Sequence, residues 1–167
     1  TFTMLSKAPF LDRTDGELAM RAAVHTLKVE NGYKIWYLGG SDWIQKNQNQ
    51  IAPTYDVKYK FFECKSIAEI AKGFSNSSTS MTFMSDDEYG LSMPQVFIED
   101  NIYKMIYSIR TYSKGYRMGY AESQDEGKTW VRKDHLMSLD VSESGWDNEM
   151  VCFGHLHKTQ NKTYLFY

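Results

Sequence analysis

The chain has 167 residues, which suffices for one domain with a hydrophobic core and is short for two. Aromatic residues make up 15% of the sequence and include 12 tyrosines, a composition that favours half-buried strands and an all-β fold. The net charge of −2 offers no positive field for a phosphate backbone, so nucleic acid is not an expected partner. No apolar run reaches the ~20 residues that cross a bilayer, so no membrane span is expected.

The first predicted element is a β-hairpin. The apolar run AAVHTLKVENG (22–32) ends in a small polar turn, and the strand-like block YKIWY (33–37) follows it. A third strand is expected from Tyr55 to Ser66. The fourth strand of this repeat stays open, because 67–74 could form a short helical turn and 75–80 is read as loop.

The same pattern returns twice along the chain. Two more hairpins are predicted, PQVFIEDN with YKMIY (94–107) and FGHLHKTQN with TYLFY (153–167). The closing tyrosines Tyr37, Tyr107 and Tyr167 are 70 (107−37) and 60 (167−107) residues apart. In the second repeat a third strand is expected from Tyr116 and a fourth over 129–134. Such self-similarity is the signature of a repeat architecture.

Four antiparallel strands per repeat, at a spacing longer than the ~40–45 residues of a WD40 blade, predict a β-propeller with long connections. We expect a single, incomplete propeller domain over 1–167, with blade boundaries near 17–80, 88–140 and 147–167. This corresponds to roughly two and a half four-stranded blades. The alternative is a β-sandwich whose strands resemble one another by chance.

The polar stretch SQDEGKTW (123–130) lies between the third and fourth strands of the second repeat. Asp125 can accept hydrogen bonds from backbone N–H groups of the turn, and Gly127 can take a positive φ. We expect this turn to fasten a blade, with Trp130 packed between blades, and not to act in catalysis.

This stretch has the Ser-x-Asp-x-Gly-x-Thr-Trp form and resembles the Asp box of sialidases and other propellers. Together with GYKIWYLGG (32–40), the segments 103–134 and 144–167 resemble the five-bladed β-propellers of glycoside hydrolase families 43, 32 and 68. The resemblance covers most of the chain and is weakest over 45–52 and 71–82. It implies three acidic residues on successive blades, the base and an auxiliary residue usually being aspartates and the acid usually a glutamate.

An acidic residue precedes each predicted inner strand: Glu17, Glu88 and Glu149. Glycoside hydrolysis needs one protonated and one ionised carboxyl group across the bond, so we expect these three as the catalytic residues. The matching positions are glutamates here, which departs from the pattern of the families. Neighbouring carboxylates remain alternatives: Asp12, Asp15, Asp86, Asp87 and Asp147.

Six further residues are expected to bind substrate at the same end of the strands. They are Arg21, Asp42, Trp43, Arg110, Tyr112 and His155. Aromatic faces stack on sugar rings, and Asp and Arg hydrogen-bond to vicinal hydroxyls. An ion pair between blades is the alternative for Arg110, and a core histidine is the alternative for His155.

Two cysteines, Cys64 and Cys152, allow at most one disulfide and form neither a CxxC pair nor a zinc framework. We expect both to be buried free thiols, and we expect no metal site and no cofactor. Unpaired thiols favour the cytoplasm. The chain starts at Thr1, so a secreted protein whose leader has been removed is the alternative.

These expectations combine into a carbohydrate-active protein whose partner is an oligosaccharide, a polysaccharide or a glycoconjugate. The first hypothesis is a glycoside hydrolase or glycosyl-transferring enzyme that uses paired carboxylates in the propeller funnel. The second is a carbohydrate-binding or scaffold propeller without turnover. A sialidase is a third, and it would need a nucleophilic tyrosine and an arginine cluster, for which Arg21, Arg110 and Arg117 are the candidates.

Overall fold

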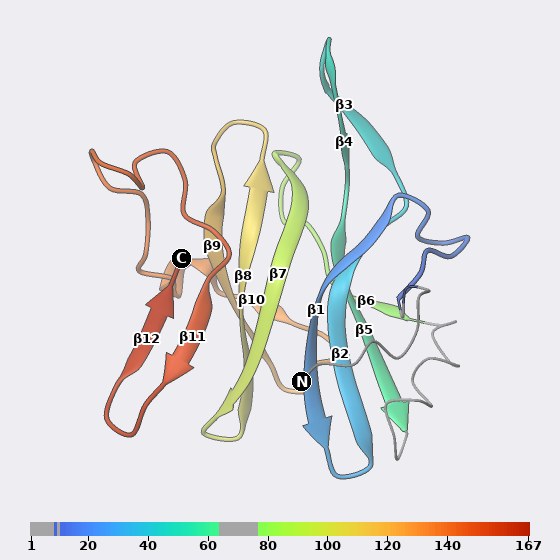
Figure 1. Cartoon of the computed structure of the whole chain (residues 1–167), viewed down its shortest axis with the longest axis vertical. Helices are drawn as coiled ribbons and strands as arrows, with labels where there is room; N and C mark the ends of the chain where they lie inside the picture. The colour runs from blue at the N-terminus through green and yellow to red at the C-terminus, as the bar shows by residue number, and fades with distance from the viewer. Residues whose placement is uncertain (1–8, 10, 64–76) are drawn as a thin grey trace.

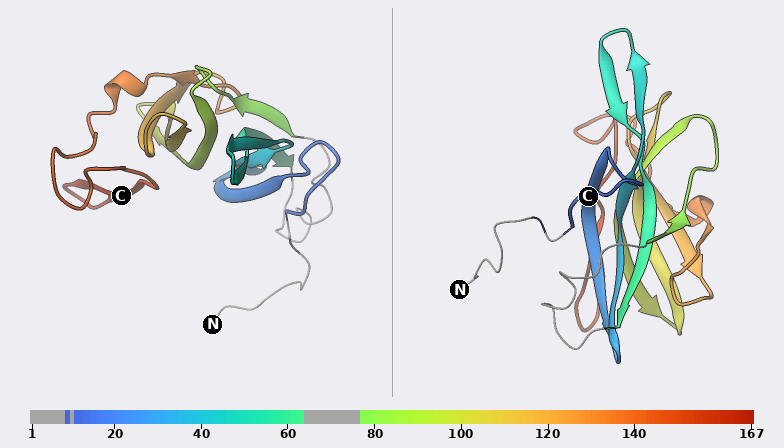
Figure 2. Two further views of the ribbon diagram at one scale, coloured as in Figure 1. Left: turned by 90° about the horizontal axis from the view of Figure 1, so that it is seen from above. Right: turned by 90° about the vertical axis from the view of Figure 1, so that its right-hand side faces the viewer.

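The computed structural model describes residues 9, 11–63 and 77–167. Three antiparallel sheets stand side by side in an arc, and a separate hairpin projects beyond one end of them (Figure 1, Figure 2). The described residues form no α-helix, only a short 3₁₀ helix, η1 (Asp134–Leu136). No helix in these ranges is long and apolar enough to cross a membrane. The prediction of an all-β fold with four-stranded antiparallel sheets is confirmed.

The first sheet has the strand order β1-β2-β5-β6. Its strands are β1 (Met20–Val29), β2 (Gly32–Gly40), β5 (Asp56–Glu63) and β6 (Ser78–Met81). β1 and β2 are the predicted first hairpin, and β5 is the predicted third strand. The helical turn considered for 67–74 lies outside the described residues.

β6 corrects the reading of 75–80 as loop, because it supplies the fourth strand of this sheet. It is an edge strand that pairs with β5 alone, and its Ser- and Thr-rich sequence carries no strand pattern. Tertiary contacts define it instead. The Ser80 hydroxyl donates to the carbonyl oxygens of Gly127 and Lys128, at 3.3 and 2.9 Å, and Met81 is buried.

The second sheet has the strand order β7-β8-β9-β10. Its strands are β7 (Glu88–Glu99), β8 (Ile102–Thr111), β9 (Arg117–Ser123) and β10 (Val131–Arg132). The second predicted hairpin and the third strand are confirmed. The fourth strand, expected over 129–134, is only two residues long because the chain passes into η1.

The third sheet is the last predicted hairpin, formed by β11 (His155–Lys158) and β12 (Thr163–Phe166). β3 (Trp43–Asn47) and β4 (Gln50–Pro53) form the projecting hairpin, which sequence analysis did not predict. The polar composition of 45–50 gives no strand signal there.

Three residues in or next to the first strand of each sheet have a left-handed backbone: Ala23, Met93 and Phe153, with φ of 47°, 49° and 59°. They are 70 (93−23) and 60 (153−93) residues apart, the same spacing as the closing tyrosines. Ala23 and Met93 lie at register shifts in β1 and β7, the strands on the concave side of the arc (Figure 2). The sequence repeat is thus also a repeat of backbone conformation.

Replacing Ala23 with glycine should stabilise the protein. A left-handed conformation costs an L-residue roughly 1–2 kcal/mol, while glycine loses roughly 0.5–1 kcal/mol of backbone entropy, so a net gain of about 0.5–1 kcal/mol is expected. Urea unfolding measures it. Ala22→Gly, next to it and without a positive φ, is the matched control and should destabilise. If both variants lose stability equally, the bulge carries no strain.

The turn 123–130 joins the first two sheets. The indole N–H groups of Trp36 on β2 and of Trp130 both donate to the Gly127 carbonyl, at 2.7 and 3.1 Å. Gly127 has a φ of 86°, and a Cβ atom there would lie 2.4 Å from the Trp36 ring. The Lys34 ammonium adds an ion pair to Glu126 at 2.7 Å. The structural role predicted for this turn, with Trp130 between sheets, is confirmed.

Hydrogen bonds inside the turn fix its shape. Asp125 accepts from the backbone N–H and hydroxyl of Thr129, at 2.9 and 2.7 Å, and from the Ser123 hydroxyl at 2.7 Å. Burial alone would raise the pKa of Asp125, but the bonds from Thr129 and Ser123 prevail and lower the pKa to about 2. The carboxylate therefore stays ionised and holds the turn at neutral pH.

Trp36→Phe should lower the free energy of unfolding by about 1–3 kcal/mol, because the buried Gly127 carbonyl loses a donor and the smaller ring leaves space. Denaturant unfolding tests this. Trp43→Phe removes an indole that is 59% exposed and should change stability by less than about 0.5 kcal/mol. Equal effects of the two substitutions would contradict the role given to Trp36.

Candidate functional site

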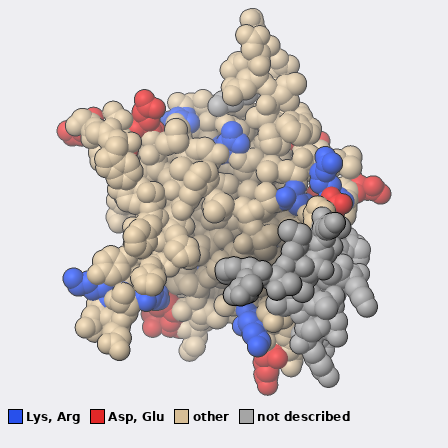
Figure 3. Space-filling view, in the orientation of Figure 1, with Lys and Arg blue, Asp and Glu red and all other residues tan. Residues whose placement is uncertain are grey.

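The predicted site residues gather at one end of the sheets, which we call the entrance end. Here β1 and β7 begin and β2 and β8 finish, and the β3–β4 hairpin projects (Figure 1). The turn 123–130 lies at the opposite end, because Ser123 pairs with Tyr103 beside the β7–β8 turn. The face that carries β1 and β7 has few charged side chains near its centre (Figure 3). The turn 123–130 and the predicted site residues thus lie at opposite ends of the sheets.

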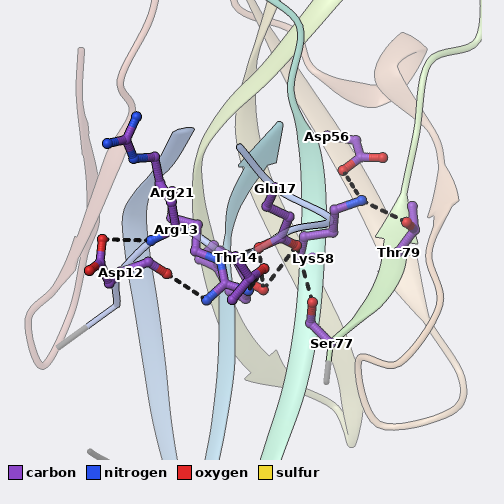
Figure 4. Close-up of polar contacts among 10 residues, drawn as sticks. Asp12, Arg13, Thr14, Glu17, Arg21, Asp56, Lys58, Ser77 and Thr79 are labelled. Atoms are coloured by element: carbon purple, nitrogen blue, oxygen red, sulfur yellow. Dashed lines mark hydrogen bonds and ion pairs between the residues drawn. The ribbon is translucent and has the colours of Figure 1, made fainter. Parts of the chain in front are cut away.

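Glu17 is 5% exposed and lies over the face of the first sheet (Figure 4). Its carboxylate is ion-paired with Arg21. It also accepts hydrogen bonds from the Tyr37 hydroxyl, on both oxygens, and from the Ser77 hydroxyl, each at 3.1 Å. It lines a cavity of about 450 Å³, which we call the Glu17 cavity. The other lining residues are Thr14, Asp15, Gly16, Arg21, Lys58 and Ser77.

Asp56 is a second carboxyl group beside Glu17 that sequence analysis missed. It pairs with Lys58 at 2.8 Å, and Lys58 also donates to Thr79 at 2.8 Å (Figure 4). Burial raises the pKa of Asp56, the Lys58 ammonium opposes this rise, and the Glu17 charge adds to it. A Cβ atom at Gly39 would lie 2.6 Å from Lys58 Cγ and 2.7 Å from Glu17 Oε1, so glycine is what leaves room for this group.

Glu88 lies in a different set of contacts. Arg132 donates hydrogen bonds to both of its carboxylate oxygens, at 2.6 and 2.9 Å, and the same guanidinium pairs with Asp134 at 2.8 Å. The side chains of Arg132 and Glu88 are only 4% and 10% exposed. Glu88 also lines a cavity of about 420 Å³ together with Tyr112, another predicted site residue. Its carboxylate is engaged in joining β7 to β10.

Glu149 is exposed, and its backbone carbonyl accepts a hydrogen bond from Arg117 at 3.1 Å. Within the described ranges no donor contacts its carboxylate. The three predicted glutamates therefore have three separate surroundings: a cavity with Arg21, a buried ion pair with Arg132, and open solvent.

The backbone repeat selects a different set of equivalent acidic residues. Glu17, Asp87 and Asp147 are 70 (87−17) and 60 (147−87) residues apart, the spacing of the left-handed residues. The Tyr167 hydroxyl donates to buried Asp147 at 3.2 Å, as Tyr37 donates to Glu17. Glu88 and Glu149 lie one and two positions beyond this repeat. Two aspartates left open by the sequence are thus the structural equivalents of Glu17.

In the second repeat the tyrosine hydroxyl does not donate to the equivalent acid. Asp87 accepts from the backbone N–H and the hydroxyl of Ser113, at 3.0 and 2.5 Å. The hydroxyl of Tyr107 donates to Asp134 instead. Asp87 thereby holds the loop that carries Tyr112, whose ring centre lies 4.8 Å from that of Tyr89.

Arg110 sits among three tyrosines, and we call these four residues the Arg110 cluster. Its Nη1 donates to the Tyr55 hydroxyl at 2.6 Å. The guanidinium carbon lies 4.7, 5.3 and 5.6 Å from the ring centres of Tyr89, Tyr116 and Tyr55. Burial and a hydrogen bond with Tyr55 raise the pKa of Tyr116. The ion pair considered for Arg110 is not formed with any carboxylate in the described part of the chain.

The remaining predicted residues lie outside these groups. Asp42 and Trp43 begin the projecting hairpin, and the Trp43 ring faces solvent. His155 is exposed, with Nδ1 3.2 Å from the Gln95 amide, so the core-histidine alternative is wrong. Cys152 is a free, partly buried thiol whose pKa is raised by burial. Cys64 lies outside the described residues.

No family model, no curated protein and no solved structure matches this chain. In the described ranges no group of three or more His, Cys, Asp or Glu side chains could hold a metal ion. We therefore infer a function from the geometry of the residues themselves.

Glu88→Gln should lower the free energy of unfolding by about 3 kcal/mol or more, because it leaves the buried Arg132 guanidinium without its main charge partner. Glu149→Gln is the matched control, since its side chain is exposed, and should stay within about 0.5 kcal/mol of wild type. Urea unfolding of both variants gives the comparison. Similar stability of the two would show that the Arg132 pair does not hold the sheet.

Proposed function

We propose that the chain forms part of a β-propeller, five-bladed when complete, in which the three sheets are successive blades. Three features support this. The sheets follow one another in an arc, β1 and β7 lie on its concave side, and the left-handed residues recur at the spacing of the sequence repeat (Figure 2). In such a propeller β1 and β7 are inner strands, and the entrance end is the mouth of the central funnel.

We propose that this protein is carbohydrate-active and hydrolyses or transfers a glycosyl unit at the Glu17 cavity. The observation that carries this proposal is the pair Glu17 and Asp56. Cleavage of a glycosidic bond uses one ionised carboxylate and one protonated carboxyl group. Three donor side chains surround Glu17, which suits a base or nucleophile. Burial raises the pKa of Asp56 although the ion pair with Lys58 opposes this rise, and an upward shift is the direction that a proton donor needs.

The rest of the cavity suits a sugar. Thr14, Asp15 and Ser77 present hydroxyl and carboxylate groups that can hydrogen-bond to sugar hydroxyls, and Arg21 and Lys58 add donors. This polar lining favours an oligosaccharide, a polysaccharide or a glycoconjugate over an apolar ligand.

The second candidate is a carbohydrate-binding propeller without turnover. The ion pair of Arg21 with Glu17 favours it, because the pair of Arg132 with Glu88 shows the same chemistry in a purely structural setting. A sialidase is less well supported. Arg21, Arg110 and Arg117 have separate surroundings, with Arg117 paired to Asp140 at 2.9 Å, and they form no common carboxylate site.

Glu17→Gln should reduce turnover of an aryl glycoside by roughly 10²–10⁴-fold, the usual contribution of a positioned acid or base, and Asp56→Asn should act similarly. A panel of aryl glycosides with a release assay measures this, and circular dichroism checks the fold of each variant. Glu143→Gln, an exposed change of the same charge, is the control.

The outcomes separate the two candidates. Unchanged turnover in both the Glu17 and Asp56 variants would exclude the cavity as the catalytic centre. Wild-type protein that binds oligosaccharides in calorimetry and turns over none would favour the binding protein.

A further inference from the structure

The Arg110 cluster contains a cation without a counterion in the described part of the chain. Three other arginines that are buried or partly buried each have a carboxylate partner: Arg21 with Glu17, Arg117 with Asp140 and Arg132 with Glu88. Arg110 has only the Tyr55 hydroxyl, on Nη1. Its Nε–H group is buried and meets no acceptor among the described residues.

Such an arrangement is costly unless a further group completes it. A buried donor without an acceptor loses its hydration and gains nothing in return, and a desolvated charge loses more. The tyrosine rings compensate part of the charge through cation–π contacts, but rings over the guanidinium faces do not satisfy its in-plane N–H groups. Polar groups of this kind call for a specific explanation.

The contacts of Arg110 leave one edge of the guanidinium without a protein acceptor among the described residues. Tyr55 takes Nη1, and the rings of Tyr89 and Tyr116 lie over the group. The buried Nε–H group meets no acceptor among the described residues, and the hydrogen bond to Tyr55 leaves Nη2 unused. This edge matches two oxygens of a carboxylate or phosphate, which arginine binds as a fork.

We propose that the Arg110 cluster is an anion-recognition site for the carboxylate or phosphate group of an acidic sugar. Tyr112, 44% exposed and 4.8 Å from the Tyr89 ring, offers an aromatic face for the sugar ring beside the cluster. Asp87, just before β7, and Glu88, its first residue, do not compete for Arg110, because Asp87 accepts from Ser113 and Glu88 is paired with Arg132. The site is separate from the Glu17 cavity, and anion binding here does not require turnover there.

The test compares four probes at equal ionic strength by calorimetry: glucuronic acid, glucose 6-phosphate, inorganic phosphate and glucose. Glucuronic acid or glucose 6-phosphate should bind at least about tenfold more tightly than glucose, as expected for charge-assisted hydrogen bonds. A preference between these two identifies the anion. Inorganic phosphate should compete with whichever acidic sugar binds.

Variants then assign the binding to Arg110. Arg110→Gln should weaken the affinity for the acidic sugar by about tenfold or more. Arg110→Lys keeps the charge but cannot bind two oxygens side by side, so its affinity should lie between those of Arg110→Gln and wild type. Arg117→Gln removes the same charge from an arginine paired with Asp140 and should leave the affinity unchanged. Binding in calorimetry is measured independently of glycoside turnover, so failure of this proposal and failure of the glycosidase proposal are distinguishable.

Three results would overturn the proposal. Wild-type protein could bind glucose as tightly as both acidic sugars, Arg110→Lys could match wild type in affinity, or Arg110→Gln and Arg117→Gln could weaken binding equally. If Arg110→Gln does not fold, the wild-type probe comparison and Arg110→Lys still decide.

Discussion

The hydrogen bond from Trp36 to the Gly127 carbonyl is the contact on which the arrangement of the sheets depends. A sheet with two partly apolar faces must cover them, and here the turn of one sheet closes over a tryptophan of the other. At the other end of the sheets, separate contacts join them. There Tyr55 of the first sheet reaches Arg110 of the second. Backbone hydrogen bonds also join the two sheets there, from the Tyr55 N–H to Tyr89 and from the Leu91 N–H to Tyr55, at 3.4 and 2.9 Å, so the Arg110 cluster lies where a second set of contacts holds the sheets side by side.

Features of the fold that rest on local chemistry could be predicted from the sequence. The hairpins at 22–37, 94–107 and 153–167 combine apolar runs with polar turns, and the turn 123–130 carries its own hydrogen-bonding residues. β6 and the β3–β4 hairpin escaped prediction because their residues are mostly polar. Such strands are specified by the neighbour with which they pair, and a single sequence does not reveal that neighbour.

In the candidate site, too, some residues could be predicted from the sequence and others could not. Glu17, Arg21, Arg110 and Tyr112 could be placed at the entrance end, because chain direction alone decides to which end of a strand a residue belongs. Their partners could not. Asp56 reaches Glu17 through the register of β5 on β2, and Arg132 reaches Glu88 from 44 residues away. The repeat was also misassigned, since Glu88 and Glu149 lie one and two positions after Asp87 and Asp147, which keep the spacing of the backbone repeat.

The two ends of the sheets differ in how completely their polar groups are satisfied, and this difference is itself an argument about function. At the turn 123–130 each charged group that bridges the sheets has its partner, as Lys34 has Glu126. At the entrance end the buried Nε–H group of Arg110 meets no acceptor among the described residues. A buried polar group without a partner costs stability, so it calls for a specific explanation, such as a ligand that supplies the missing acceptor. This difference supports the proposal that a ligand binds at the entrance end.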